Sequence, residues 1–183
     1  MNHLIDRAKN IKVLIIDLDG TLTDGIYQVS QFGKITKSFY TRDFSWIGKL
    51  LYEYNDILVC ILTNSTDECL SQKYINLPYK DNVHFNISVG IKDKKEFIEN
   101  NFKTIIDNSN YEYRNISWDE IAYIGDGEND LESMKLSAIT GCPQDAEEEI
   151  KEESNFVSKY NGGRGAVADF IKYLISLRED KNV

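Results

Sequence analysis

Two aspartates near the start of the chain have the type and spacing needed for metal or phosphoryl chemistry. Asp17 and Asp19 lie in an Asp-Leu-Asp-Gly-Thr motif directly after the apolar run of residues 13–16. Carboxylates held this close repel each other, so that a pKa rises or a cation binds between them. Mg²⁺ prefers oxygen ligands of this kind. A calcium-binding loop, which begins in a similar way, is excluded because it requires Glu at the position of Gln28.

A second acidic cluster follows another apolar run, at residues 121–124. It reads Gly-Asp-Gly-Glu-Asn-Asp over residues 125–130. Asp126 offers a further metal ligand, and Asp130 lies one helical turn later, where its carboxylate would hold Asp126 or a metal-bound water. Taken alone, the same residues are also typical of a helix N-cap at Asn129.

Hydroxyl and amide side chains follow the apolar run of residues 57–62. These side chains belong to Thr63, Asn64 and Ser65. A hydroxyl together with backbone N–H groups suits a phosphoryl oxygen. Thr63 is therefore a candidate contact for a phosphoryl group, and its two neighbours are candidate substrate contacts. Taken alone, however, these residues are more typical of a helix N-cap at Ser65 or Thr66.

Three lysines, Lys92, Lys94 and Lys95, open the next predicted helix. One ammonium group that points inward would neutralise a phosphate as a point charge. Most lysines on protein surfaces are solvated, so the residue types alone do not choose among the three.

Short apolar runs alternate with amphipathic stretches along the chain, which predicts an α/β fold with a mainly parallel sheet. The carboxyl ends of parallel strands lie at one edge of the sheet, so the polar clusters would meet there. The predicted strands are residues 13–16, 57–62, 83–89, 121–124 and 138–140, and the predicted helices are residues 45–54, 66–75, 92–102, 129–136, 145–153 and 166–177. We expect one domain over residues 1–183.

One segment interrupts this alternation. Residues 26–29 and 35–40 flank a turn that contains Gly33, which predicts a β-hairpin over about residues 26–40. Because the hairpin directly follows the first motif, we expect it to project near the site. Residues 107–111 are polar and predict a surface loop.

The composition excludes several classes of partner. A net charge of −9 argues against broad binding to nucleic acid or to an anionic membrane surface. No apolar stretch approaches the roughly 20 residues that a membrane helix needs. The three cysteines, Cys60, Cys69 and Cys142, form no CxxC pair, and the first residues lack the apolar run of a signal peptide. We therefore expect a reduced, cytoplasmic chain.

Along the chain, the first motif is Asp-Leu-Asp-Gly-Thr at residues 17–21, the second is Thr63, the third is the lysine group and the fourth is the Gly-Asp cluster at residues 125–130. In this chain order, the motifs resemble those of the haloacid dehalogenase superfamily, most of whose members are phosphohydrolases with an aspartate nucleophile and Mg²⁺. The resemblance spans residues 17–130 and implies a three-layer, Rossmann-like parallel sheet. It implies that Asp17 is the nucleophile that forms an aspartyl-phosphate. Asp19 would be the general acid for the leaving group and then the general base for water. Thr63 would hold the phosphoryl group.

The resemblance also implies a metal site and chooses one lysine. Mg²⁺ would be bound by Asp17, the main-chain carbonyl of Asp19 and Asp126, with Asp130 supporting them. The family lysine lies at the start of a helix, and the Asp-Lys pair at residues 93–94 matches that pattern, so Lys94 is the expected catalytic lysine.

The spacing of the motifs indicates that the cap domain of many relatives is absent. Only 46 positions separate Asp17 from Thr63, and the hairpin with one helix uses them. The 31 positions from Thr63 to Lys94 hold one helix and one strand. The chain therefore resembles the capless branch of the superfamily, in which another subunit often covers the site, and the hairpin is the expected contact.

The C-terminal tail, about residues 160–183, points to one family within that branch. Its Gly-Gly-Arg-Gly-Ala-Val sequence includes Gly163 and Arg164, and it accompanies Asp-Gly at 24–25 and Thr-Arg-Asp at 41–43. These motifs resemble the 3-deoxy-D-manno-octulosonate 8-phosphate (KDO 8-phosphate) phosphatase family over about residues 11–177. That family implies a homotetramer, with central hairpins and a tail that closes a neighbour's site. Gly163, Arg164 and Arg42 are then expected substrate contacts.

Two departures from the family pattern concern the substrate. The family usually carries Gly-Arg after the second-motif residue, where this chain has Asn64 and Ser65, and it prefers Gly where this chain has Phe44. The expected activity is therefore a Mg²⁺-dependent phosphomonoesterase for a phosphorylated 2-keto-3-deoxy sugar acid. A phosphatase for nine-carbon ketosugar-acid 9-phosphates and a broad sugar-phosphate phosphatase are the alternatives.

Two further classes of function remain open. A non-catalytic oligomerisation module, related to the domain fused to some acylneuraminate cytidylyltransferases, is disfavoured because such a module does not need a carboxylate cluster. A sugar phosphomutase is disfavoured because it must keep water from the aspartyl-phosphate, usually with a cap.

Overall fold

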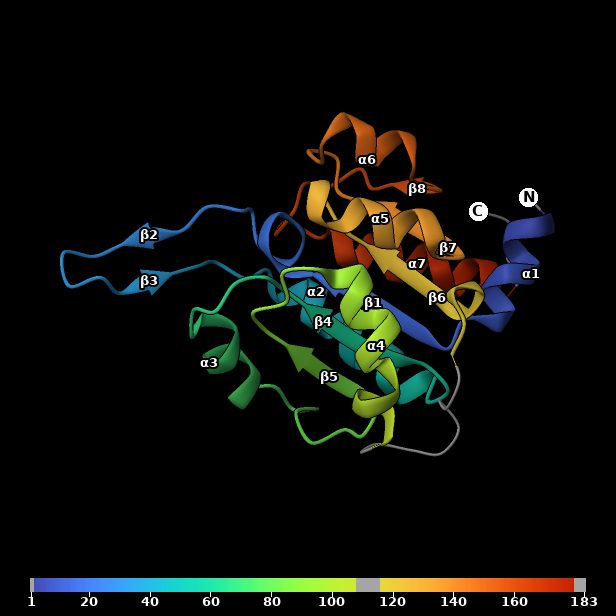
Figure 1. Cartoon of the computed structure of the whole chain (residues 1–183), viewed down its shortest axis with the longest axis horizontal. Coiled ribbons are helices and arrows are strands. Elements are labelled where there is room, and N and C mark those ends of the chain that lie inside the picture. Colours follow the sequence, from blue (N-terminus) through green and yellow to red (C-terminus); the bar gives the residue numbers. More distant parts are fainter. Residues whose placement is uncertain (1, 108–115, 180–183) are drawn as a thin grey trace.

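A six-stranded, fully parallel sheet forms the centre of the computed structural model, which describes residues 2–107 and 116–179 (Figure 1). The strand order is β5-β4-β1-β6-β7-β8. The strands are β1 (Val13–Asp17), β4 (Leu58–Leu62), β5 (Phe85–Ser88), β6 (Ile121–Ile124), β7 (Ile139–Cys142) and β8 (Phe156–Val157). The first-motif strand therefore lies between the strands that precede the second and fourth motifs.

The central strands are apolar on both faces, as parallel strands covered by helices must be. In β1, Leu14 and Ile16 belong to one hydrophobic cluster, whereas Val13 and Ile15 belong to the cluster on the opposite face. Tyr123 of β6 is fully buried in the second cluster. This two-sided burial explains why the strands read as continuous apolar runs rather than as alternating patterns.

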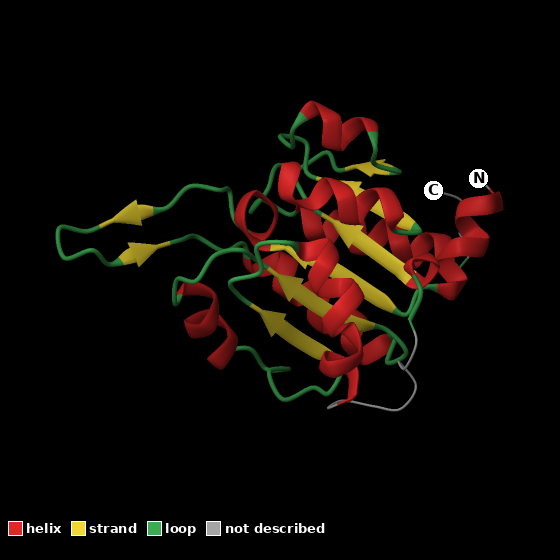
Figure 2. Ribbon diagram, in the orientation of Figure 1, coloured by secondary structure: helices red, strands yellow, loops and turns green. Residues whose placement is uncertain are grey.

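Helices cover both faces and give three layers (Figure 2). One face is covered by α1 (Asn2–Asn10), α2 (Thr41–Glu53), α3 (Cys69–Ile75) and α7 (Ala166–Arg178), and the other by α4 (Lys94–Asp107), α5 (Glu128–Leu136) and α6 (Glu148–Glu152). Short helical turns at Leu18–Leu22 and Trp118–Glu120 complete the described elements. None of the helices in the described part of the chain has the length and apolar character needed to cross a membrane.

The predicted hairpin is present and projects away from the sheet (Figure 1). Its strands β2 (Gln28–Val29) and β3 (Ile35–Thr36) pair antiparallel. Gly33 has a φ of +75° in the turn and donates its N–H to the Ser30 carbonyl at 2.9 Å. Two paired residues per strand leave most of the hairpin extended and exposed, with little support from the rest of the chain.

The α/β class, the parallel sheet and the absence of a separate cap in the described residues are as predicted. Helix α1 and strand β8 were not predicted. α1 is short and polar on most positions, and β8 has only two residues. Helix α2 begins at Thr41, four residues before its predicted start, while α3 and α6 are shorter than predicted. The predicted loop at 107–111 lies outside the described residues, except for Asp107, which ends α4.

Candidate active site

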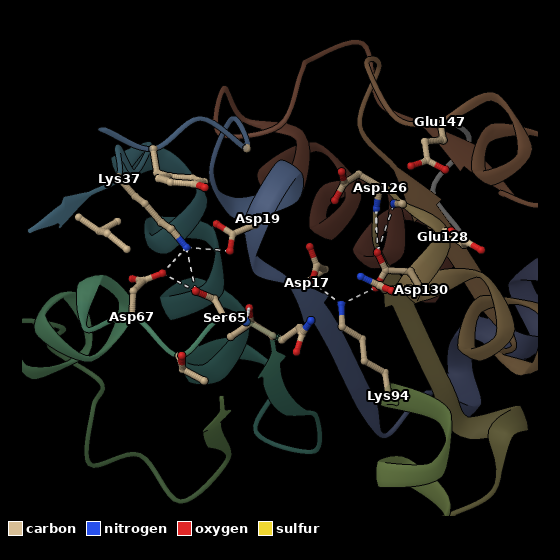
Figure 3. Close-up of a pocket in the computed structure, with 18 residues that line it drawn as sticks. Asp17, Asp19, Lys37, Ser65, Asp67, Lys94, Asp126, Glu128, Asp130 and Glu147 are labelled. Carbon is tan, nitrogen blue, oxygen red and sulfur yellow. Dashed lines mark hydrogen bonds and ion pairs between the residues drawn. The ribbon is translucent and has the colours of Figure 1, made fainter. Parts of the chain in front are cut away.

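The carboxyl ends of β1, β4 and β6 converge on one open pocket of about 710 Å³ (Figure 3). Asp17 is the last residue of β1, Thr63 follows β4, and Asp126 lies two residues after β6. All three line the pocket, together with Asp19 and Lys94. The register of the sheet therefore brings together motifs that lie more than 100 positions apart in the sequence.

Three carboxylates in this pocket form a group that could hold a metal ion. Ligand oxygens of Asp17, Asp126 and Asp130 all lie within 4.8 Å of one another. Burial, and next the charge of Asp130, raise the pKa of Asp17 well above its ordinary value and the pKa of Asp126 to about 6. Buried carboxylates this close to one another are a favourable set of oxygen donors for a hard divalent cation. Thr21 Oγ1 donates to Asp126 Oδ1 at 3.0 Å and orients this carboxylate.

Asp130 acts mainly as a support for its neighbours. Its Oδ2 accepts hydrogen bonds from the backbone N–H of Asp126 at 3.1 Å and of Gly127 at 3.4 Å. Its Oδ1 accepts from Lys94 Nζ at 2.6 Å and from the Tyr123 hydroxyl at 2.7 Å. Four donors fix this side chain, so it holds the fourth-motif loop and the lysine in place, as a supporting carboxylate should.

Lys94 bridges the nucleophile position and this support. Its ammonium group contacts Asp17 Oδ1 and Asp130 Oδ1 and is almost fully buried. Burial alone would lower the pKa of Lys94, but the charges of Asp17 and Asp130 raise it overall. The lysine is therefore a fixed positive charge beside Asp17. Of the other two lysines considered, Lys92 is exposed and Lys95 approaches Glu132 at 3.9 Å.

The second-motif residues line the same pocket. Thr63 is buried, and its Oγ1 accepts a hydrogen bond from the Ser65 backbone N–H at 3.0 Å. Its hydroxyl hydrogen can therefore be directed at an oxygen in the pocket. Asn64 and Ser65 are also part of the lining. The arrangement provides a carboxylate, a fixed cation and a hydroxyl donor around one small volume, which is what phosphoryl transfer needs.

Comparisons with known proteins agree with this geometry. A family model described as haloacid dehalogenase-like hydrolase matches residues 108–171. The chain is 29% identical to 3-deoxy-D-manno-octulosonate 8-phosphate phosphatase KdsC of Yersinia pestis, over 98% of this chain and 87% of that protein. The chain is therefore similar to haloacid dehalogenase-like hydrolases. With a relative of this kind over nearly its whole length and the carboxylates of the pocket in place, it is a phosphatase.

Two further proteins are similar to this chain over most of its length. The chain is 23% identical to N-acylneuraminate cytidylyltransferase of Oncorhynchus mykiss, over 96% of this chain but 38% of that longer protein. The structure of 3-deoxy-D-manno-octulosonate 8-phosphate phosphatase from Moraxella catarrhalis, in complex with magnesium, phosphate and KDO, superposes with a TM-score of 0.80 at 24% identity and covers 98% of this chain and 94% of its own. The fold of this haloacid dehalogenase-like phosphatase is therefore the fold of that enzyme.

The three predicted substrate contacts near the tail and hairpin lie apart from the pocket lining of this phosphatase. The guanidinium of Arg42 lies 5.7 Å from the centre of the Tyr40 ring. The Arg164 side chain is 66% exposed and approaches Asp24 at 3.3 Å. Gly163 donates its N–H to the Thr21 carbonyl at 3.0 Å, so it packs against the first-motif loop. Within one copy of the chain these residues support or surround the site rather than line it.

Sequence reasoning missed three residues that the structure places at this site. Lys37 and Asp67 line the pocket, and the hydroxyl of Tyr123, a core residue of β6, donates a hydrogen bond to Asp130. Asp67 carries a recognisable signal, because it precedes α3 and accepts the Cys69 N–H at 2.9 Å, as a turn residue before a helix does. Lys37 has no comparable local signal, since its position depends on how far the hairpin returns toward the sheet.

Proposed function

We propose that this phosphatase is a Mg²⁺-dependent phosphomonoesterase that works through an aspartyl-phosphate. The observation that carries the proposal is the position of Asp17 at the carboxyl end of β1, in contact with Lys94 and close to the carboxylates of Asp126 and Asp130. Asp17, Asp126 and the main-chain carbonyl of Asp19 would hold the cation, and the grouping of Asp17 and Asp126 in the pocket supports this set. When bound, Mg²⁺ would offset the charge of a phosphate that faces several carboxylates.

The first half of the reaction transfers the phosphoryl group to the protein. A carboxylate oxygen of Asp17 attacks phosphorus, and the bond between phosphorus and the ester oxygen breaks. Asp19 gives a proton to the departing alkoxide. Thr63 and Lys94 contact the phosphoryl oxygens, so that the charge that develops there meets a hydroxyl donor and an ammonium group.

The second half restores the enzyme. Asp19 takes a proton from a water molecule, which attacks the phosphorus of the aspartyl-phosphate and releases inorganic phosphate. Asp17 and Asp19 return to their starting states, so one molecule of water is consumed for each ester hydrolysed.

For the substrate, we propose a phosphorylated 2-keto-3-deoxy sugar acid similar to KDO 8-phosphate. The full-length similarity to the enzyme from Yersinia pestis supports this class, as does the shared fold with the Moraxella catarrhalis enzyme. A nine-carbon ketosugar-acid 9-phosphate or several sugar phosphates remain alternatives, because Asn64 and Ser65 replace the usual Gly-Arg. A non-catalytic module is disfavoured by the buried ion pair of Asp17 with Lys94, which assembly alone does not require.

We further propose that the single domain of residues 1–183 acts in the cytoplasm as a homo-oligomer, most simply a tetramer. Exposed apolar side chains on the hairpin support self-association. In such an assembly, Arg42 or Arg164 of a neighbouring copy would bind the sugar carboxylate. Replacing each arginine by Ala would then raise KM for a sugar-acid phosphate more than for a neutral sugar phosphate, and equal losses on both would refute the assignment.

The central test is phosphate release from a panel of sugar phosphates, with eight- and nine-carbon ketosugar-acid phosphates included. Activity that requires Mg²⁺, disappears with excess EDTA and is absent in Asp17→Asn is expected. Acid quenching during turnover should trap one phosphate on the native chain and none on Asp17→Asn. Full activity of Asp17→Asn, or no activity of the native chain with Mg²⁺ on any member of the panel, would overturn the proposal.

A further inference from the structure

Lys37 lies at the base of the hairpin, directly after β3, and its side chain points into the pocket (Figure 3). Only 4% of this side chain is exposed, although most of the hairpin is open to solvent. Its ammonium group lies 2.7 Å from Asp19 Oδ2, 2.5 Å from Asp67 Oδ2 and 3.1 Å from Ser65 Oγ. One lysine therefore joins the hairpin, the first-motif loop and the loop before α3.

The counterion of Lys37 is fixed independently of Asp19. Asp67 accepts hydrogen bonds from the Cys69 backbone N–H and from the Ser65 hydroxyl. Burial works against the charged form of Asp67, but its bonds from Lys37 and Ser65 lower its pKa overall. Burial likewise works to lower the pKa of Lys37, but its bonds to Asp19 and Asp67 raise it overall. The ammonium group thus has a second carboxylate partner besides Asp19.

This second pairing means that the position of Lys37 does not depend on Asp19 alone. Asp67 and Ser65 hold the ammonium group from the loop before α3. A buried cation is costly to leave without a paired carboxylate, and Asp67 supplies one that the proposed chemistry does not use. The side chain that would transfer protons is therefore distinct from the side chains that hold the lysine.

Asp19 has a definite need for such support. Its side chain is 35% exposed, and the one other side-chain hydrogen bond that its carboxylate makes among the described residues comes from Thr23 Oγ1 at 3.2 Å. A partly exposed carboxylate with one long hydrogen bond would sample several rotamers, whereas proton transfer requires one. The bond from Lys37 reaches Oδ2, so that each of the two carboxylate oxygens of Asp19 accepts a hydrogen bond.

We propose that Lys37 is a positioning residue that holds the carboxyl group of Asp19 in line for proton transfer to the leaving group, with Asp67 and Ser65 as its fixed support. The proposal rests on the proposed phosphatase mechanism. It identifies the base of the hairpin as part of the catalytic apparatus, and it accounts for a buried lysine on an otherwise exposed segment.

Substrates whose leaving groups differ in basicity distinguish this positioning role from a role in stabilising the fold. An alkoxide or phenolate of high basicity needs a proton as it departs, whereas p-nitrophenolate leaves readily without one. Phenyl phosphate and p-nitrophenyl phosphate have nearly the same shape, so they report proton transfer rather than binding. A sugar phosphate that the native chain hydrolyses completes the set. The quantity to compare is kcat/KM, which covers the steps up to the first release of product.

The variants are Lys37→Met, Lys37→Arg and Asp67→Asn, with Asp19→Asn as the reference and Lys34→Met, on the exposed hairpin, as the matched control. We expect Lys37→Met to lower kcat/KM about 100-fold on the sugar phosphate and on phenyl phosphate, and less than about 5-fold on p-nitrophenyl phosphate. Asp19→Asn should show the same ordering of substrates. Lys37→Arg should recover part of the loss, and Lys34→Met should behave as the native chain.

Several outcomes would overturn the proposal. Equal losses on all three substrates, or no loss, would show that Lys37 does not act through Asp19. If Lys37→Met shows no cooperative unfolding transition on heating, Asp67→Asn decides, because it keeps the lysine and removes its support. Asp67→Asn must then lower kcat/KM more for the sugar phosphate and phenyl phosphate than for p-nitrophenyl phosphate, with smaller losses than Lys37→Met would give. If the native chain with Mg²⁺ hydrolyses no sugar phosphate of the panel and neither aryl phosphate, the proposed function itself fails and this inference falls with it.

Discussion

Asp43 of α2 accepts a hydrogen bond from the backbone N–H of Ala168, in the first turn of α7, at 2.8 Å. α7 follows Gly165, which has no side chain to cap the helix, so its N-terminal N–H groups are satisfied from another helix. Asp43 is fully buried. The segment before α7 packs against the first-motif loop, where Gly163 donates to the Thr21 carbonyl. The carboxylate of Asp43 therefore helps to fix the segment on which the catalytic loop rests.

Replacing Asp43 by Ala should destabilise the chain by about 1–3 kcal/mol, because it removes the cap and leaves buried N–H groups of α7 unpaired. The free energy of unfolding in urea measures this loss. Asp81→Ala, at an exposed position, is the control and should change stability by less than about 0.5 kcal/mol. An unchanged midpoint and slope for Asp43→Ala would show that the hydrogen bond does not support the fold.

The same carboxyl group gives a pH dependence with a definite sign. Burial is the main cause that raises the pKa of Asp43 to about 6, from an ordinary value of 3.8. The folded chain then binds this proton more tightly than the unfolded chain does. Its contribution to stability is present below about pH 4 and is lost as the pH rises to about 6, with an upper bound of about 3 kcal/mol.

Comparison of the native chain with Asp43→Asn isolates that contribution, since Asn cannot titrate. The stability of the native chain relative to the variant should fall between about pH 4 and pH 6 and then stay constant. Urea unfolding at half-unit steps of pH measures the difference. A difference that rises over this interval would contradict the assigned direction of the pKa.

Gly162 tests the contact between the tail and the first motif. A Cβ atom at this position would lie 1.8 Å from the backbone oxygen of Gly20, and neither backbone can move aside freely. Gly162→Ala should therefore displace the loop that carries Asp17 and Asp19, with a loss of activity of at least about 10-fold and of stability by roughly 1–3 kcal/mol.

The matched control is Gly33→Ala at the hairpin turn. A Cβ atom there meets nothing within 4 Å among the described residues, although its positive φ adds a local strain of about 1 kcal/mol. This variant should keep the native kcat. If Gly162→Ala is as active as the control, the tail does not position the catalytic loop.

Periodicity and motif order were enough to predict the sheet and the residues that its carboxyl ends bring together. The runs that became β1, β4 and β6 are buried on both faces, and continuous apolar sequence is the signature of such strands. Asp17, Thr63 and Asp126 then follow from the strand ends. By contrast, α1 has few apolar residues to reveal its period, and β8 depends on pairing with β7 rather than on its own two residues.

Long side chains that cross between elements could not be predicted in the same way. Lys37 reaches Asp19 and Asp67 from a hairpin whose direction is set by three-dimensional packing. The sequence around Tyr123 predicts only a buried aromatic residue in a strand. The hydrogen bond of its hydroxyl group to Asp130 depends on the three-dimensional fold. The roles predicted for Arg42 and Arg164 depend on a second copy of the chain, which lies beyond what one chain's sequence pattern specifies.

Metal binding should appear as a change in thermal stability. Mg²⁺ at about 100 times its Kd would stabilise the native chain by about 2.7 kcal/mol, or roughly 5–10 °C in Tm. In Asp126→Asn the shift should nearly vanish, because one of the clustered carboxylates is lost. In EDTA this variant should be at least as stable as the native chain, because a buried repulsion is relieved. Circular dichroism melts with and without Mg²⁺ give both numbers.

The control for that experiment is Glu132→Gln, on the exposed face of α5. It changes the net charge by the same amount and should keep the full Mg²⁺ shift. An equal shift in Asp126→Asn and in the native chain would place the stabilising ion elsewhere.

Phe32 at the tip of the hairpin is 87% exposed, and three more apolar side chains on the same segment are exposed: Ile26, Tyr27 and Val29. A two-stranded ribbon with so much apolar surface gains stability when a second copy covers it. We expect the native chain to sediment as an oligomer and Phe32→Asp to sediment as a smaller species. Val83→Asp, at an exposed apolar position away from the hairpin, should leave the oligomer intact. If the native chain is a monomer at micromolar concentration, the hairpin has another role, and the arginines of a neighbouring copy cannot complete the site.

The same variant tests where the sugar acid is recognised. Phe32→Asp should dissociate the oligomer and raise KM for a sugar-acid phosphate, while the Asp17 phosphoenzyme still forms. That result would show that the chemistry resides in one copy and that recognition of the sugar acid requires two.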